Sequence, residues 1–160
     1  MQMPFISEVA VRLVTATLIG SALGLDRELR HKPAGLKTHA LVALGAALVT
    51  AVTVKMPDSA AVSRAIQGII AGVGFLGGGA ILKSNDEMVT GLTTAASIWV
   101  AASLGIASGV GQWIAALIAL AIAVIVLVFG NVVEQRLLKT NRPTASFSPP
   151  PPSGSGPERP

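Results

Sequence analysis

The chain has 160 residues, of which 51% are hydrophobic and only 12% are charged. Soluble domains carry about 25% charged residues, so this composition argues against a soluble globular protein and points to the membrane. The net charge is +4, but the basic residues are scattered among Ala, Leu and Pro without interleaved aromatic residues, which argues against a nucleic-acid partner. The absence of cysteine excludes disulfides and thiolate metal sites.

Five apolar segments predict a bundle of transmembrane helices, because a helix needs about 20 apolar residues to cross the hydrocarbon core of a bilayer. No Asp, Glu, Lys or Arg lies between Glu87 and Glu134, and Gly109-Val110-Gly111-Gln112 divides that run into two spans. The predicted fold is therefore all-α, with one transmembrane domain over residues 1–136. We place its spans at about 9–25, 38–54, 65–82, 92–108 and 112–130.

The end of the chain has a different composition from the bundle. Residues 137–160 are polar and rich in proline, with four consecutive prolines at Pro149–Pro152. Such a segment buries too little apolar surface to fold, so we expect a disordered or polyproline-like tail.

Basic residues predict how the bundle is oriented in the membrane. They concentrate in the first loop and after the fifth span, at Arg27, Arg30, Lys32, Lys37, Arg136, Lys139 and Arg142. Because cytoplasmic loops carry the excess of Lys and Arg, we expect the first loop, the third loop and the C-terminus in the cytoplasm and the N-terminus outside.

One face of the first span is marked by a spacing of four residues: Arg12, Ala16, Gly20, Gly24 and Glu28. Residues with this spacing share a helix face, and small residues such as Gly20 and Gly24 favour close helix–helix contact. Two arrangements are open for Arg12. It points into the bundle, where Glu8 one turn earlier pairs with it, or it lies near the outer boundary and extends to water.

Ionisable residues are densest at the first loop. Asp26, Arg27 and Glu28 close the first span there, and their two carboxylates are oxygen ligands that suit a hard cation such as Mg²⁺. The interleaved basic residues compete for these carboxylates as ion pairs. The loop is therefore either a cation-binding mouth or a basic loop with local salt bridges.

At the far end of this loop, Lys37, Thr38 and His39 begin the second span. Thr38 is a candidate N-cap, because a threonine hydroxyl accepts hydrogen bonds from free backbone N–H groups at a helix start. His31 and His39 do not have the spacing of paired metal ligands on a helix face, so we predict no transition-metal site.

The third span is unusually rich in glycine, with Gly68, Gly72, Gly74, Gly77, Gly78 and Gly79. Its Gly72–Gly77 segment matches a dinucleotide-binding pattern, but the match lies inside a membrane-length apolar run without the required preceding strand. Gly68, Gly72 and Gly79 share one helix face, and the other three lie roughly opposite. The span is therefore either packed closely on both sides or broken near residues 77–79, where its backbone would line a cavity.

Polar side chains follow in the third loop and the start of the fourth span, including Asn85, Thr93, Thr94 and Ser97. Thr93 and Ser97 are one helical turn apart, so we expect their hydroxyls to face the same neighbour. These hydroxyls either bond to their own backbone carbonyls or form part of a polar path.

Four blocks of sequence resemble the MgtC/SapB family of membrane proteins over about residues 6–130. They are 23–28 (LGLDRE), 32–39 (KPAGLKTH), 72–79 (GVGFLGGG) and 91–100 (GLTTAASIWV). The resemblance implies a bacterial inner-membrane protein with five spans and a link to magnesium limitation, and in pathogens to survival inside phagocytes. It also implies a functional role for Asp26. Longer members carry a soluble ACT-like C-terminal domain, so this chain resembles the short SapB-type form.

The family is often labelled as magnesium transporters, although some members resemble regulators of membrane partners such as the proton-translocating ATP synthase. We expect a non-enzymatic regulator serving magnesium homeostasis, surrounded by the lipid bilayer and by a membrane-protein partner, a second copy of the chain, or both. No cofactor is implied beyond an unproven association with Mg²⁺. The alternative is an oligomeric transporter or channel for magnesium or another ion.

Overall fold

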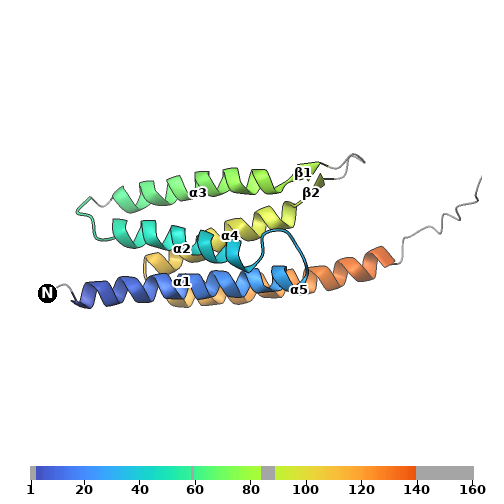
Figure 1. Cartoon of the computed structure of the whole chain (residues 1–160), viewed down its shortest axis with the longest axis horizontal. Coiled ribbons are helices and arrows are strands. Elements are labelled where there is room, and N and C mark those ends of the chain that lie inside the picture. Colours follow the sequence, from blue (N-terminus) through green and yellow to red (C-terminus); the bar gives the residue numbers. More distant parts are fainter. Residues whose placement is uncertain (1–2, 59, 84–88, 140–160) are drawn as a thin grey trace, which may run out of the picture.

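The computed structural model describes residues 3–58, 60–83 and 89–139 of the chain. Its helices are α1 (Met3–Leu29), α2 (Leu36–Thr53), α3 (Ala60–Ala80), α4 (Leu92–Gly109) and α5 (Trp113–Lys139) (Figure 1). Each of the five contains a stretch long and apolar enough to cross a membrane. The prediction of an all-α bundle with five spans is confirmed.

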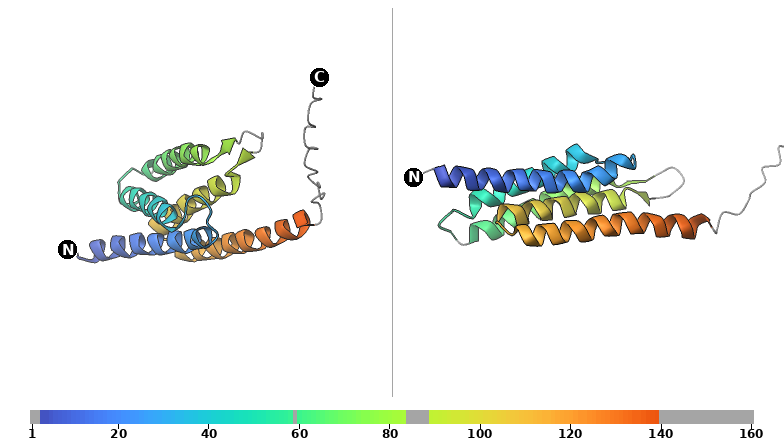
Figure 2. Two further views of the ribbon diagram at one scale, coloured as in Figure 1. Left: turned by 45° about the vertical axis from the view of Figure 1, so that its right-hand side comes forward. Right: turned by 90° about the horizontal axis from the view of Figure 1, so that it is seen from below.

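Successive helices run in opposite directions (Figure 1). The α1–α2 loop, the α3–α4 connection and the end of α5 lie at one end of the bundle, and the α2–α3 and α4–α5 turns lie at the other with the start of α1. Helices α1, α2 and α4 pack on one another and form the centre. Helix α3 packs mainly on α4 at one edge, and α5 lies along α1 and α4 at the opposite edge (Figures 1 and 2).

The first and last helices are longer than the spans predicted for them. Helix α1 continues through Asp26, Arg27 and Glu28 to Leu29, and α5 continues well beyond Gly130. Charged residues end the hydrophobic stretch but need not end the helix, because such side chains reach the interface or a neighbouring helix while the backbone stays helical.

The start of α2 differs from the sequence prediction. Gly35 is the N-cap and α2 begins at Leu36, so the assignment of Thr38 as N-cap is wrong. The carboxylate of Glu28 accepts a hydrogen bond from the backbone N–H of Leu36 at 3.0 Å. A side chain from α1 therefore satisfies a free N–H group at the start of α2, which local sequence does not reveal.

A short antiparallel ribbon joins α3 to α4, where the sequence predicts only a loop. Strand β1 (Leu82–Lys83) pairs with β2 (Val89–Thr90), with Leu82 opposite Thr90. Gly91 then begins α4 with φ 90°, and a side chain there would collide with the carbonyl of Ala80. The predicted site residue Asn85 lies outside the described residues.

Glycine allows the central helices to touch through their backbones. A Cβ atom added at Gly20 would lie 2.6 Å from the carbonyl oxygen of His39, and Gly24 lies as closely against the start of α2. Gly105 of α4 has a similar contact with the backbone of Ala43. Gly20 and Gly24 thus lie where α1 touches α2, and in a membrane such contacts stabilise helix pairs that lipid does not drive together.

The glycine-rich helix α3 is continuous from Ala60 to Ala80, so it is not broken near residues 77–79. Only Gly77 has a close neighbour: an added Cβ would lie 3.5 Å from Cβ of Ala95. At the other glycines, Gly68, Gly72, Gly74, Gly78 and Gly79, an added Cβ would meet no atom within 4 Å. Among the described residues α3 is not closely packed on both sides, because it lies at the edge of the bundle and has α4 mainly on one side.

Candidate functional site

Four polar side chains meet in the interior of the bundle and form what we call the Arg27 cluster: Arg27, His39, Thr94 and Ser97. Arg27 is only 2% exposed, and its Nη2 donates a hydrogen bond to Oγ1 of Thr94 at 2.6 Å. His39 is 0% exposed, with Nε2 3.0 Å from Oγ of Ser97. Helices α1, α2 and α4 each contribute to the cluster, which lies toward the end of the bundle that holds the α1–α2 loop.

The helix periodicity explains how these side chains come together. Gly20, Gly24 and Arg27 are four and three residues apart, so they share one face of α1. The two glycines bring α2 close enough for His39 to enter the interior, and Arg27 follows one turn later. The spacing from Gly20 and Gly24 could have predicted that Arg27 is buried. Its charge instead favoured a place in the first loop.

On α4 the structure corrects the pairing predicted from sequence. Thr93 is exposed, whereas Thr94 and Ser97 are buried and face α1 and α2. The two buried residues, Thr94 and Ser97, are three positions apart. Thr93 and Ser97, four positions apart, do not both face the neighbouring helices. Ser97 donates to the carbonyl of Thr94 at 2.8 Å and also contacts His39, so bonding to its own helix does not exclude a contact between helices.

The charged residues that end α1 do not converge on one point. Asp26 Oδ1 accepts a hydrogen bond from Nε of Arg30 at 2.8 Å, and Glu28 turns to the start of α2. Arg27 points into the bundle. Lys37 and Thr38 are exposed. The basic-loop interpretation, with local salt bridges, describes this region better than a cation-binding mouth.

Of the described carboxylates at this end, Asp26 and Glu28 have separate partners and do not together form a magnesium site. Mg²⁺ requires near-octahedral oxygen coordination, commonly with one or two carboxylates and several waters. Oδ2 of Asp26 is buried without a hydrogen-bond partner. It is a single oxygen, however, and two positive side chains are close: Arg30 pairs with Oδ1, and Arg27 is the next residue. Among the side chains that the structure describes, in residues 6–58, 60–81 and 89–130, no group of three or more His, Asp or Glu could hold a metal ion.

Arg12 occupies the opposite end of the same helix face and points into the bundle. Its Nη1 donates to the carbonyl of Gly109 at 2.6 Å, and its Nη2 donates to Oε1 of Glu8 at 2.5 Å. Oε2 of Glu8 lies 3.4 Å from Nζ of Lys55. Of the two arrangements open from sequence, the one in which Arg12 points into the bundle is found, and its partner Glu8 is half-exposed at the end of the bundle. Arg12 thereby satisfies a carbonyl at the C-terminus of α4, where positive charge is favourable.

His39 and Ser97 have the separation of a general base and its nucleophile. Both are enclosed, however: His39 is fully buried and Ser97 is 4% exposed. A substrate cannot reach either side chain in this conformation, so the pair serves as an interhelical hydrogen bond here.

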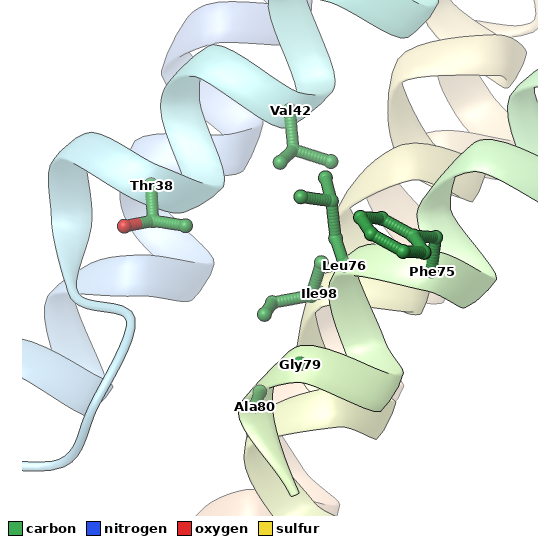
Figure 3. A pocket seen from close by; sticks show the side chains of 7 residues that line it. All are labelled: Thr38, Val42, Phe75, Leu76, Gly79, Ala80 and Ile98. Atoms are coloured by element: carbon green, nitrogen blue, oxygen red, sulfur yellow. The ribbon is translucent and has the colours of Figure 1, made fainter.

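A groove between α2 and α3 opens on the surface of the bundle. One part of it, of about 360 Å³, is lined by Thr38, Val42, Phe75, Leu76, Gly79, Ala80 and Ile98 (Figure 3). A neighbouring part of about 430 Å³ includes Gly45 of α2 and Gly72 of α3. At the edge of the groove Phe75 is 84% exposed. The groove is apolar and faces the surroundings of the spans, so its contents would be lipid or another membrane helix.

Comparison with known proteins identifies the family. The sequence model of the MgtC family matches residues 13–136, which is most of the chain. The chain belongs to the MgtC family. Together with the five apolar helices, this membership makes it a multi-pass membrane protein.

Three relatives show how far the similarity of this MgtC-family chain extends. Protein SrpB of Synechococcus elongatus is 45% identical in an alignment that covers 64% of this chain and 63% of SrpB. Protein SapB of Bacillus subtilis is 41% identical over 65% of this chain and 48% of SapB. YhiD of Escherichia coli (strain K12), whose name proposes a magnesium transporter, is 40% identical over 67% of this chain and 53% of YhiD.

The chain therefore matches between about half and just under two thirds of the length of these relatives. No solved structure matches it. The functions of these relatives therefore support a proposal about this chain.

Proposed function

We propose that this chain is an inner-membrane protein of a bacterium that serves magnesium homeostasis by regulating membrane partners. The link to magnesium is supported by membership of the MgtC family and by the name of YhiD. The choice of regulation is supported by one structural observation, the open face of α3 that carries Gly68, Gly72 and Gly79.

The glycines of α3 have different surroundings from the glycines in the centre of the bundle. At Gly20, Gly24 and Gly105 the lack of a side chain is required by a neighbouring backbone within the chain. Five glycines of α3 have no such neighbour, although each interior glycine costs a helix up to about 1 kcal/mol relative to alanine. In a membrane, contact with another closely approaching helix offsets this cost. We therefore assign the α3 face and its groove to a transmembrane helix of a partner protein.

The orientation is part of the same proposal. The exposed basic residues Lys32 and Lys37 lie at the end of the bundle that also holds the α3–α4 connection and the end of α5 (Figure 1). By the positive-inside rule this end faces the cytoplasm and the N-terminus lies outside. The Arg27 cluster is then close to the cytoplasmic surface.

A growth assay tests the regulatory proposal. In a bacterium that lacks its own family member, wild-type protein should restore growth at limiting magnesium, and Gly72→Leu should not. The new side chain has open space within the chain, so it should block a partner without unfolding the bundle. Ile118→Phe is the matched control, because Ile118 is an exposed residue of α5 outside the groove. Full growth of the Gly72→Leu strain would contradict the proposal.

The alternative is an oligomer that transports magnesium or another ion. The observation that favours it is the Arg27 cluster, since polar groups inside a membrane bundle are costly and commonly serve transport. Against it, the centre of the bundle is closed by small apolar side chains such as Ala16, Ala43 and Ala47. Purified protein in liposomes containing a magnesium-sensitive dye separates the two. Protein-dependent magnesium uptake would support transport, and its absence together with loss of growth in Gly72→Leu supports regulation.

A further inference from the structure

The hydrogen bonds around His39 determine which of its nitrogens carry protons. Nδ1 lies 2.9 Å from the carbonyl oxygen of Gly35. A carbonyl only accepts hydrogen bonds, so Nδ1 must carry a hydrogen and donate it. In the neutral imidazole Nε2 is then a lone-pair acceptor, 3.0 Å from Oγ of Ser97.

Ser97 satisfies Nε2 in either protonation state. When His39 is neutral, the hydroxyl of Ser97 donates to Nε2. When His39 is an imidazolium, Nε2 donates to Oγ of Ser97, and the hydroxyl hydrogen turns to the carbonyl of Thr94, 2.8 Å away. Both ring nitrogens and the serine hydroxyl are hydrogen-bonded in each state, and no heavy atom has to move.

We infer that His39 is a reversible proton-binding site inside the bundle, with the hydroxyl of Ser97 as the rotor that accommodates the bound proton. A buried histidine with a purely structural role needs partners for one protonation state. Here the partners fit two, and the switch between them is a single rotation of the Ser97 hydroxyl.

The surroundings show what proton binding would do. Of the described residues, Arg27 of α1 is the charged group that acts on His39 from a packed helix, and α4 presents the hydroxyls of Thr94 and Ser97. On α2 itself, Lys37 is exposed, and Glu28 of α1 is bonded to the backbone at the helix start.

A proton on His39 thus places a second positive charge near Arg27. The new charge also lies in the first turns of α2, at the positive end of the helix dipole. Both interactions are repulsive, so the loaded site loosens the contact of α2 with α1. This inference goes beyond the proposed function, because it provides an input signal, the proton, whichever partner the protein has.

Nitrogen NMR of the full-length protein tests the site directly. The chain has two histidines, and His31 is exposed in the first loop, so His31→Gln leaves His39 as the only imidazole. In protein labelled with ¹⁵N-histidine, we expect hydrogen on Nδ1 and a lone pair on Nε2 at about pH 8. Hydrogen should appear on both nitrogens as the pH is lowered, reversibly and with unchanged helix content. A hydrogen on Nε2 alone at high pH, or proton uptake only together with unfolding, would overturn the inference, as would an imidazole that stays neutral.

Two buried serines of α4 provide a matched pair for the rotor. Ser97→Ala removes the acceptor for Nε2–H, and Ser108→Ala removes a hydroxyl that bonds to the backbone carbonyl of Leu104. Hydrogen bonds to a charged group are about twice as strong as neutral ones, so Ser97→Ala should weaken proton binding roughly tenfold, shifting the midpoint down by roughly one pH unit. Ser108→Ala should leave the midpoint in place. Equal midpoints in both variants would contradict the role of Ser97.

Discussion

At the scale of single residues, the two arginines of the inner face of α1 have different surroundings. Arg12 has an acidic partner in Glu8 and a backbone carbonyl in Gly109. Arg27 is buried with a single side-chain hydrogen bond to Thr94, and its Nε has no partner. A buried positive charge with so few hydrogen bonds destabilises a fold, so a contribution to stability does not account for Arg27 at this position.

Arg12 is expected to stabilise the bundle by joining α1 to the end of α4. Arg12→Gln should lower the free energy of unfolding by about 1–3 kcal/mol, because a partly buried, charged hydrogen bond is lost. Arg64→Gln is the control: Arg64 pairs with Asp58 in an exposed position, where ion pairs contribute about 0–1 kcal/mol. Denaturant unfolding of both variants in detergent measures the difference. Equal effects would show that Arg12 does not connect the two helices.

Asp58, which lies outside the spans, should make the stability of the folded protein depend on pH. The hydrogen bond from Arg64 and that from the backbone N–H of Ala60 hold the pKa of Asp58 below its usual value. A lowered pKa in the folded state means that its contribution to stability is present above the unfolded value and is lost as the pH falls through the folded one. Asp58→Asn should therefore remove a small acid-dependent component of unfolding. Thermal scans between about pH 6 and about pH 3 measure it, and an unchanged dependence would contradict the assignment.

At the scale of elements, the glycines divide into two classes that sequence alone does not separate. Gly105 is enclosed by the backbone of α2, whereas Gly72 has open space within the chain. Gly105→Leu should prevent the packing of α4 on α2 and abolish the folded monodisperse protein. Gly72→Leu should leave its elution and helix content unchanged. Size-exclusion chromatography and circular dichroism distinguish them, and loss of fold in both would mean that α3 has neighbours within the chain.

Features that depend on local composition could be predicted from the sequence, whereas features that depend on contacts between helices could not. The five spans depend on apolar composition, so they were predictable, and so was the close contact at Gly20 and Gly24. The edge position of α3 depends on which helices face each other, and glycine spacing does not encode that. The burial of Thr94 instead of Thr93, and the capping of α2 by Glu28, depend on contacts between helices far apart in sequence.

At the scale of the whole molecule, the bundle consists of a tight centre and two lightly packed edges. Helices α1, α2 and α4 form the centre, which holds both the Arg27 cluster and the Arg12 pair. Helices α3 and α5 lie at the two edges (Figure 2), and many of their large apolar side chains are exposed. Of the two edges, that of α3 combines a groove with unpartnered glycines, and this difference is the basis for assigning it to a partner.

Site-specific crosslinking in native membranes tests that assignment most directly. The chain has no cysteine, so Gly72→Cys and Ile118→Cys each carry a single reactive thiol, one in the groove of α3 and one on the outer face of α5. With a short bifunctional reagent we expect Gly72→Cys to form a discrete adduct with a second membrane protein, and Ile118→Cys to form none. The same adducts from both positions, or no adduct from Gly72→Cys, would contradict the account.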